Sequence, residues 1–135
     1  MVRFGIVGAG SIAQKFARDI RLVKNASLVA VASRDALKAF EFKEKYDLEV
    51  AYGSYLEMAK DPNIDAVYIA TPHNFHFEQS LLYLNHQKHV LCEKPIAVNK
   101  EQLEMMISTA KNNDMLLMEA MWSKFLPAHV LIKQL

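Results

Sequence analysis

The chain has 135 residues, with 16 Lys and Arg against 15 Asp and Glu, and 52% of its residues are hydrophobic. This length is typical of roughly one domain, and the composition is that of a globular protein with a core, which excludes intrinsic disorder, collagen-like repeats and a coiled coil. The net charge of +1 leaves no excess of basic side chains to neutralise a row of phosphates, so we expect no nucleic-acid partner.

Six short apolar runs predict β-strands, and segments with helical periodicity separate them. Residues 28–32 and 66–70 are apolar throughout and lack the alternation of a strand with one exposed face. This pattern is typical of an α/β protein of the Rossmann type, with a doubly wound, six-stranded parallel sheet and helices on both faces. The strands are predicted at residues 2–7, 27–32, 49–52, 66–70, 89–92 and 115–120.

Polar residues that cap helices open several of the segments between the strands. Ser54 with Glu57, and Asn99 with Gln102, have the spacing of a capping box. Asp35 is expected to cap the helix that follows the second strand. The predicted helices include 11–23, 36–45 and 74–86, with further helices after Ser54 and Asn99.

A glycine-rich motif follows the first predicted strand and opens the first predicted helix. Its sequence is Gly8-Ala9-Gly10-Ser11-Ile12-Ala13. Gly8 permits a tight turn, Gly10 leaves room for a pyrophosphate to approach the backbone, and Ala13 allows the helix to pack closely on the strand. Ile12 and Phe16 are expected to face inward from this helix. The motif predicts a dinucleotide site at a helix N-terminus.

The residues after the second predicted strand indicate which dinucleotide would bind. Enzymes that select NAD usually place Asp or Glu there to bind the ribose 2′-hydroxyl, whereas this chain has Ser33 and Arg34. The Arg34 guanidinium can bind a 2′-phosphate through two hydrogen bonds, and the Ser33 hydroxyl can add another. The sequence therefore favours NADP(H), with NAD(H) as the alternative.

Two polar segments follow the fourth and fifth predicted strands. They are Thr71-Pro72-His73-Asn74-Phe75-His76 and Cys92-Glu93-Lys94-Pro95. Because ligands of an open α/β sheet bind outside the carboxyl ends of its strands, both segments are expected to line the same crevice as the glycine motif. Lys94, in a turn between Glu93 and Pro95, is suited to polarise a substrate oxygen beside a nicotinamide.

The histidines and the cysteine allow more than one interpretation. His73 and His76 are three residues apart, but no carboxylates or cysteines cluster near them, so no metal site is predicted. His76 either lines the substrate or nicotinamide pocket or packs at the start of a helix. Cys92 is the single cysteine, which fits a reducing compartment, and it is expected to pack within the sheet. We also expect Met105, Met106, Met115, Met118 and Met121 to fill the core.

The last residues differ from a completed domain. A helix begins after Pro127 and reaches the last residue without a polar or glycine cap. We therefore expect a dinucleotide-binding domain over residues 1–121, followed at 122–135 by a connecting helix or the start of a truncated second domain. No signal peptide and no run of about 20 apolar residues is found, so no membrane contact and a cytoplasmic location are expected.

Together these motifs resemble the glucose-fructose oxidoreductase/inositol dehydrogenase (Gfo/Idh/MocA) family of NAD(P)-dependent oxidoreductases, specifically its N-terminal nucleotide-binding half. The closing stretch resembles the branch of dimeric dihydrodiol dehydrogenases and D-xylose dehydrogenases. The residues that carry the resemblance are 8–13, Ser33-Arg34, Ala70-Thr71-Pro72, His76, Glu93-Lys94-Pro95 and 119–127. Lys124 departs from the branch, which more often carries Arg there.

The resemblance implies a role for each matching residue. Lys94 would hold the reacting oxygen of the substrate, and His76 would stand with it as a catalytic residue. The implied cofactor-binding residues are Gly8, Gly10, Ser11 and Ile12 near the pyrophosphate, Ser33 and Arg34 at the 2′-phosphate, and Thr71, Pro72, Asn74, Glu93, Lys94 and Trp122 toward the nicotinamide.

The resemblance also implies what the chain lacks. Members of the family continue into an α/β domain that supplies substrate groups and usually the dimer contact, and that substrate domain is absent here. We therefore expect the cofactor-binding part of a homo-oligomeric oxidoreductase that transfers hydride between NADP(H) and a sugar, polyol or trans-dihydrodiol, with little activity of its own. The alternatives are a non-catalytic NAD(P)-binding sensor of the same fold and an interaction module that binds no nucleotide.

Overall fold

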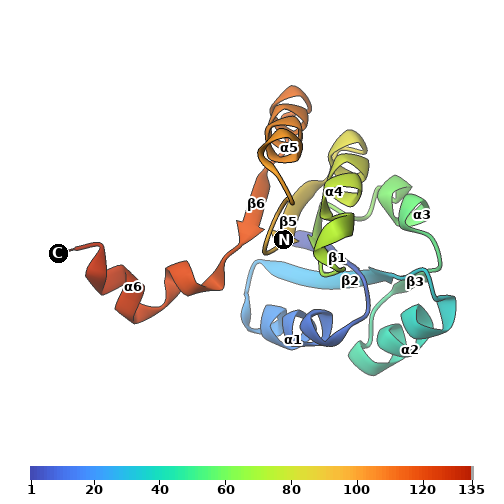
Figure 1. Ribbon diagram of the computed structural model, residues 1–135. Coiled ribbons are helices and arrows are strands. Elements are labelled where there is room, and N and C mark those ends of the chain that lie inside the picture. The colour runs from blue at the N-terminus through green and yellow to red at the C-terminus, as the bar shows by residue number, and fades with distance from the viewer. Residues whose placement is uncertain (135) are drawn as a thin grey trace.

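The molecule is built around six parallel strands whose order in the sheet differs from their order in the chain. The computed structural model describes residues 1–134, and Figure 1 shows the sheet between two groups of helices. The strands lie in the order β3-β2-β1-β4-β5-β6. They are β1 (Val2–Val7), β2 (Ala26–Ala32), β3 (Val50–Tyr52), β4 (Ala66–Ile69), β5 (His89–Glu93) and β6 (Leu117–Ala120). The order reverses between β1 and β4, which is where ligands of such sheets bind.

Helices cover both faces of the sheet, as the apolar strands predicted. Figure 1 shows α1 and α2 on one face and α3, α4 and α5 on the other. The helices are α1 (Ser11–Asp19), α2 (Ala36–Tyr46), α3 (Tyr55–Lys60), α4 (His76–Asn85), α5 (Lys100–Asn112) and α6 (Pro127–Ile132). Three short 3₁₀ helices are η1 (Ile20–Leu22), η2 (His73–Phe75) and η3 (Trp122–Phe125). The doubly wound fold class is confirmed.

The predicted helix caps are present, and two helix boundaries differ from the prediction by more than one residue. The side chains of Asp35, Ser54 and Asn99 each accept a hydrogen bond from the first turn of the helix that follows. The first helix tightens after Asp19 into η1, so it is shorter than the predicted 11–23. The fourth helix begins at His76, because the preceding residues form η2 after Pro72.

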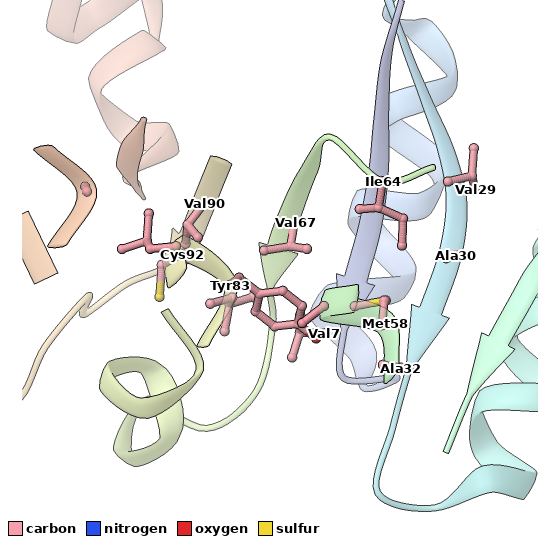
Figure 2. Packing of buried hydrophobic residues seen from close by; sticks show 14 residues of the cluster. Val7, Val29, Ala30, Ala32, Met58, Ile64, Val67, Tyr83, Val90 and Cys92 are labelled. Carbon is pink, nitrogen blue, oxygen red and sulfur yellow. The ribbon is translucent and has the colours of Figure 1, made fainter. Parts of the chain in front are cut away.

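Each face of the sheet has its own hydrophobic core. Ile6 and Val7 are adjacent in β1 and fully buried, and they point into opposite cores because strand side chains alternate. Figure 2 shows the core beneath α3, α4 and α5, where Tyr83 and Met58 pack against strand residues. Cys92 is fully buried in this core. Burial raises the pKa of its thiol to about 12, so the thiol is protonated and serves packing, as expected.

The chain after β6 leaves the sheet. Figure 1 shows η3 and α6 extending away from the helices that cover the strands. Trp122 and Phe125 of η3 are exposed, and so are the apolar side chains of α6. Among residues 1–134, no helix is long and apolar enough to cross a membrane.

An ion pair at the amino ends of the strands fastens β1 to the segment before β4, and it predicts a pH dependence of folding stability. Arg3 donates through Nε and Nη2 to the two carboxylate oxygens of Asp65 at 3.0 and 2.8 Å. The hydrogen bond from the Arg3 side chain lowers the pKa of Asp65 to about 2. A depressed carboxyl pKa stabilises the fold above the unfolded pKa of about 3.9, and this contribution is lost as the pH falls toward 2.

We expect Asp65→Asn to lower the free energy of unfolding by about 1 kcal/mol at pH 6, a value reduced for solvent screening because the Asp65 side chain is 36% exposed. The difference from the parent chain should shrink to near zero at pH 2. Urea unfolding at several pH values measures it, with Glu41→Gln on the exposed side of α2 as the control. A constant difference across this range would contradict the assignment.

Candidate functional site

The candidate site lies at the carboxyl ends of β1, β2, β4 and β5. Two cavities open there and bring together most of the residues that the sequence predicted. The first, of about 350 Å³, is lined by Gly8, Gly10, Ser33, Arg34, Thr71 and Pro72, together with Lys38, Phe75, Gln79 and four others. The second, of about 550 Å³, is lined by Ile12, Glu93 and Trp122, together with Phe16, Tyr68, Met118 and six others.

Gly8 and Gly10, the two glycines of the first loop, differ in what a side chain at their position would meet. Gly8 has φ +98°, and a Cβ there would lie 3.1 Å from Thr71 Cγ2 and 3.3 Å from the Ala70 carbonyl oxygen. A side chain at position 8 therefore meets both backbone strain and a neighbouring loop. Gly10 is in an extended conformation, and a Cβ there would have nothing within 4 Å. The space beside Gly10 is open to a ligand.

The start of α1 offers backbone donors to that space. Gly10 is the N-cap of α1, and no side chain caps the helix. The first amide groups of a helix have no partner within the helix and carry its positive dipole end, which favours an anion such as a pyrophosphate. Ser11 is exposed at this end of α1, but it is not among the residues that line either cavity.

The side of the first cavity formed by the end of β2 and the start of α2, called the cationic side below, carries two basic side chains. Arg34 follows β2, and its guanidinium carbon lies 5.1 Å from the centre of the Phe75 ring, a cation–π contact. Lys38, in the first turn of α2, lines the same cavity. The sequence analysis missed Lys38 and Phe75, and no spacing signal pointed to them, because Arg34 lies before the cap of α2 and shares no helix face with Lys38.

Asp35 and Ser33 also line this cavity, and both side chains accept hydrogen bonds from nearby backbone N–H groups. The Asp35 carboxylate accepts from the backbone N–H groups of Leu37 and Lys38 at 3.0 and 3.3 Å, so it serves as the cap of α2. The Ser33 hydroxyl accepts from the Asp35 backbone N–H at 3.2 Å, and Ser33 is buried. The cavity wall thus presents Arg34 and Lys38 as its charged donors.

The loop after β5 is held by a carboxylate. The Tyr68 hydroxyl donates to Glu93 Oε1, and the Lys94 backbone N–H donates to Glu93 Oε2 at 3.2 Å. Burial, with the hydrogen bond to Glu93, raises the pKa of Tyr68, so Tyr68 is a protonated donor. The Lys94–Pro95 peptide bond is cis, and the Lys94 side chain is exposed. Lys94 itself lines neither cavity.

The second cavity is apolar and corrects two predictions about packing. Ile12 is 40% exposed and faces this cavity rather than the core beneath α1, while Phe16 stacks on Tyr68 with ring centres 4.0 Å apart. Met106 is fully buried as expected, but Met118 is 49% exposed, and Met105 is similarly exposed on α5. Met118 lines the second cavity opposite residues of α1 and η3, which accounts for its exposure.

Asn74 is exposed, whereas His76 is buried. Asn74 is exposed in η2 and lines neither cavity. His76 is only 1% exposed, and its Nδ1 and Nε2 atoms each lie 2.8 Å from a backbone carbonyl oxygen, that of Pro95 and that of Thr71. The ring is therefore packed at the helix start, behind the loops, and not on the open surface of a pocket. Among residues 1–134, no three His, Cys, Asp or Glu side chains cluster as metal ligands.

The chain resembles known dehydrogenases in sequence. The chain is 44% identical to a trans-1,2-dihydrobenzene-1,2-diol dehydrogenase of Danio rerio over 99% of this chain and 41% of that protein. It is 46% identical to a scyllo-inositol 2-dehydrogenase (NADP(+)) of Bacillus subtilis over 94% of this chain and 39% of that protein. The chain thus spans about two fifths of the length of these relatives.

Solved structures agree with this likeness. An NAD binding oxidoreductase from Klebsiella pneumoniae superimposes with a TM-score of 0.92 at 33% identity, over 98% of this chain and 38% of that chain. A 3-ketoreductase from Actinomadura kijaniata, in complex with NADP and TDP-benzene, superimposes with a TM-score of 0.93 at 28% identity, over 98% and 41%. A family model described as an oxidoreductase family with an NAD-binding Rossmann fold matches residues 2–121. The chain therefore belongs to the Gfo/Idh/MocA oxidoreductase family, and residues 2–121 match the NAD-binding Rossmann domain of that family.

Proposed function

We propose that the chain is the cofactor-binding part of an oxidoreductase that transfers hydride between NADP(H) and a CH–OH group of a sugar, polyol or trans-dihydrodiol. The observation that carries this proposal is the first cavity, which is lined both by Gly10, with open space beside it, and by the cations Arg34 and Lys38. A dinucleotide needs both a close backbone approach for its pyrophosphate and a group that recognises its ribose.

The two ends of the cofactor would use different residues. The pyrophosphate would lie against Gly8, Gly10, Ser11 and Ile12, and the 2′-phosphate against Ser33, Arg34 and Lys38. Phosphate recognition by a planar guanidinium and an adjacent ammonium favours NADP(H), and NAD(H) would bind more weakly. The nicotinamide would lie toward Thr71, Pro72, Asn74, Glu93 and Trp122.

Lys94 would act on the substrate. When bound, the nicotinamide supplies or accepts the hydride. The exposed Lys94 ammonium would donate a hydrogen bond to the reacting oxygen and balance the charge that develops on it. The Glu93 carboxylate accepts from the Tyr68 hydroxyl and from the Lys94 backbone N–H, and these contacts would fix the start of the loop that carries the ammonium.

The relatives support the class of substrate and not its identity. Their names include a dihydrodiol dehydrogenase and an inositol dehydrogenase, which both act on CH–OH groups. We propose residues 1–121 as the dinucleotide-binding domain and 122–135 as the connection to a second domain that completes the substrate site and the homo-oligomer contact. Residue 135 of that range lies outside the described residues. We also propose a cytoplasmic location, where NADP(H) would be available to the chain.

Binding of dinucleotides to the chain tests the proposal directly. Trp122 lines the second cavity and is the single tryptophan, so its fluorescence should change on titration with NADPH. We expect saturable binding that is tighter for NADPH than for NADH. Strong competition by 2′,5′-ADP and weak competition by 5′-ADP would support the assignment of Arg34 and Lys38 to the 2′-phosphate. Absence of binding by fluorescence and by thermal shift would overturn the proposal.

The ring of Phe75 should contribute to the preference for NADPH. Phe75→Leu keeps an apolar side chain but removes the cation–π contact that holds Arg34, a contact of about 0.5–1 kcal/mol at an exposed site. We expect a roughly twofold to fivefold weaker NADPH affinity, with NADH affinity unchanged. Phe40→Leu is the matched control, because the Phe40 ring also makes a cation–π contact, with Lys43, but lies on the exposed side of α2. An equal change for both dinucleotides would contradict this role.

A further inference from the structure

We infer that His76 is a positioning residue that joins the loop after β4 to the loop after β5 and so fixes Lys94 relative to the cofactor cavity. The inference rests on the proposed function for its meaning, because it concerns the placement of the proposed catalytic lysine. It replaces the expectation that His76 itself touches the reacting atoms.

The imidazole spans two loops that are far apart in the sequence. Nε2 lies 2.8 Å from the carbonyl oxygen of Thr71, and Nδ1 lies 2.8 Å from the carbonyl oxygen of Pro95. The ring is 1% exposed, so water does not compete for either contact. Both ring nitrogens face backbone acceptors, which leaves neither nitrogen free to exchange a proton with a substrate.

Each contact ends on a segment that is part of the site. Thr71 lines the first cavity, and its hydroxyl donates to Gln79, one helical turn after His76 in α4. Pro95 directly follows Lys94, whose backbone N–H donates to Glu93. Helix α4 therefore holds the β4 loop at two points, and through His76 it also holds the loop that carries Lys94.

The number of hydrogens on the two ring nitrogens determines which of the two contacts are hydrogen bonds. A ring nitrogen donates to a carbonyl oxygen only when it carries a hydrogen, so both contacts are hydrogen bonds in the imidazolium and one of them is in either neutral tautomer. An asparagine amide nitrogen is as many bonds from Cβ as Nδ1 is, and a glutamine amide nitrogen as many as Nε2. Each amide can therefore replace one ring nitrogen as a donor.

This difference allows the two contacts to be removed one at a time. We expect His76→Asn to keep the Pro95 contact and lose the Thr71 contact, and His76→Gln to do the opposite. In 1H–15N spectra of the labelled chain without cofactor, His76→Gln should shift the amides of Lys94 and Ile96 and leave that of Thr71. His76→Asn should shift the Thr71 amide and leave those of Lys94 and Ile96.

Cofactor affinity gives a second readout. Because Thr71 lines the cavity, NADPH should bind roughly tenfold more weakly to His76→Asn, and within about threefold of the parent chain for His76→Gln. His76→Leu, which fills similar space without a donor, should shift both loops. His86 is the matched control: its Nδ1 lies 2.7 Å from the Leu82 carbonyl oxygen of its own helix, so His86→Gln should move neither loop.

Two results would overturn the inference. If Asn and Gln at position 76 disturb both loops to the same extent, or if Leu disturbs neither, His76 only fills space. Should Leu prevent folding, the Asn and Gln comparison still decides. The amide shifts are measured without cofactor, so they test this inference even if the parent chain fails to bind NADPH, which would instead refute the proposed function.

Discussion

Replacing Gly10 by valine is expected to abolish the binding of both NADPH and NADH while the chain remains folded. The valine side chain would occupy the space through which the pyrophosphate approaches the first amides of α1, and we expect a loss of affinity of at least about 100-fold. Within the chain itself a Cβ at position 10 meets nothing within 4 Å, and the extended backbone there suits valine.

The fold should lose little in this variant. Valine is a poorer N-cap than glycine, which costs about 1 kcal/mol or less and lowers the melting temperature by a few degrees. Fluorescence titration and thermal unfolding of the same sample measure both effects. Unchanged affinity for both dinucleotides would refute a cofactor site beside Gly10.

Gly8→Ala provides the contrasting variant. At φ +98°, and with Thr71 and the Ala70 carbonyl close to the added Cβ, alanine strains the fold itself. We expect Gly8→Ala to lose both stability and binding, whereas Gly10→Val loses binding alone. The pair separates a glycine needed by the backbone from a glycine needed by the ligand, a distinction that the shared motif does not make.

The sequence predicted the sheet well because its signals are local. Fully apolar runs identify strands that are covered on both faces, and capping residues such as Asp35 and Asn99 mark where helices begin. The glycine motif correctly predicted a turn between the carboxyl end of β1 and the start of α1, since this position follows from strand, turn and helix alone. The parallel order then brought the ends of β2 and β4 to the same cavity.

The features that the sequence did not predict all depend on contacts between segments. Lys38 and Phe75 line the cavity of Arg34 because α2 and η2 flank the same strand ends. The sequence left two positions open for His76, and the buried one is found because two carbonyl oxygens from different loops face the ring. Ile12 is 40% exposed because it faces the second cavity, between α1 and residues of β5, β6 and η3. None of these distances is encoded in spacing along the chain.

The Tyr68–Glu93 pair, which lines the second cavity, illustrates the same limit. Glu93 was expected beside the nicotinamide from the family resemblance, but the partner that orients it, Tyr68, comes from β4, a neighbouring strand. The pairing follows from register: Tyr68 lies opposite Leu91, two residues before Glu93, so both side chains lie on the same face. The carboxylate is thereby fixed before any ligand binds, which agrees with a role in placing Lys94.

Replacing Arg34 by alanine is expected to change the dinucleotide preference of the chain more than any other substitution at the cationic side. Hydrogen bonds to a charged group contribute about 1.5–3 kcal/mol, so NADPH should bind roughly 10- to 100-fold more weakly. NADH carries no 2′-phosphate and should bind within about threefold of its affinity for the parent chain. The same titration with both dinucleotides measures the ratio.

Lys38→Ala should act in the same direction with a smaller effect, because a flexible ammonium makes a less directional contact than a guanidinium. Both losses should shrink as salt is added, since screening weakens exposed charge pairs. Lys100→Ala is the control: Lys100 is an exposed lysine of α5 that pairs with Glu104 and lines neither cavity. If Arg34→Ala weakens NADPH and NADH equally, Arg34 contacts a part that the two dinucleotides share, and the preference for NADP(H) must come from elsewhere.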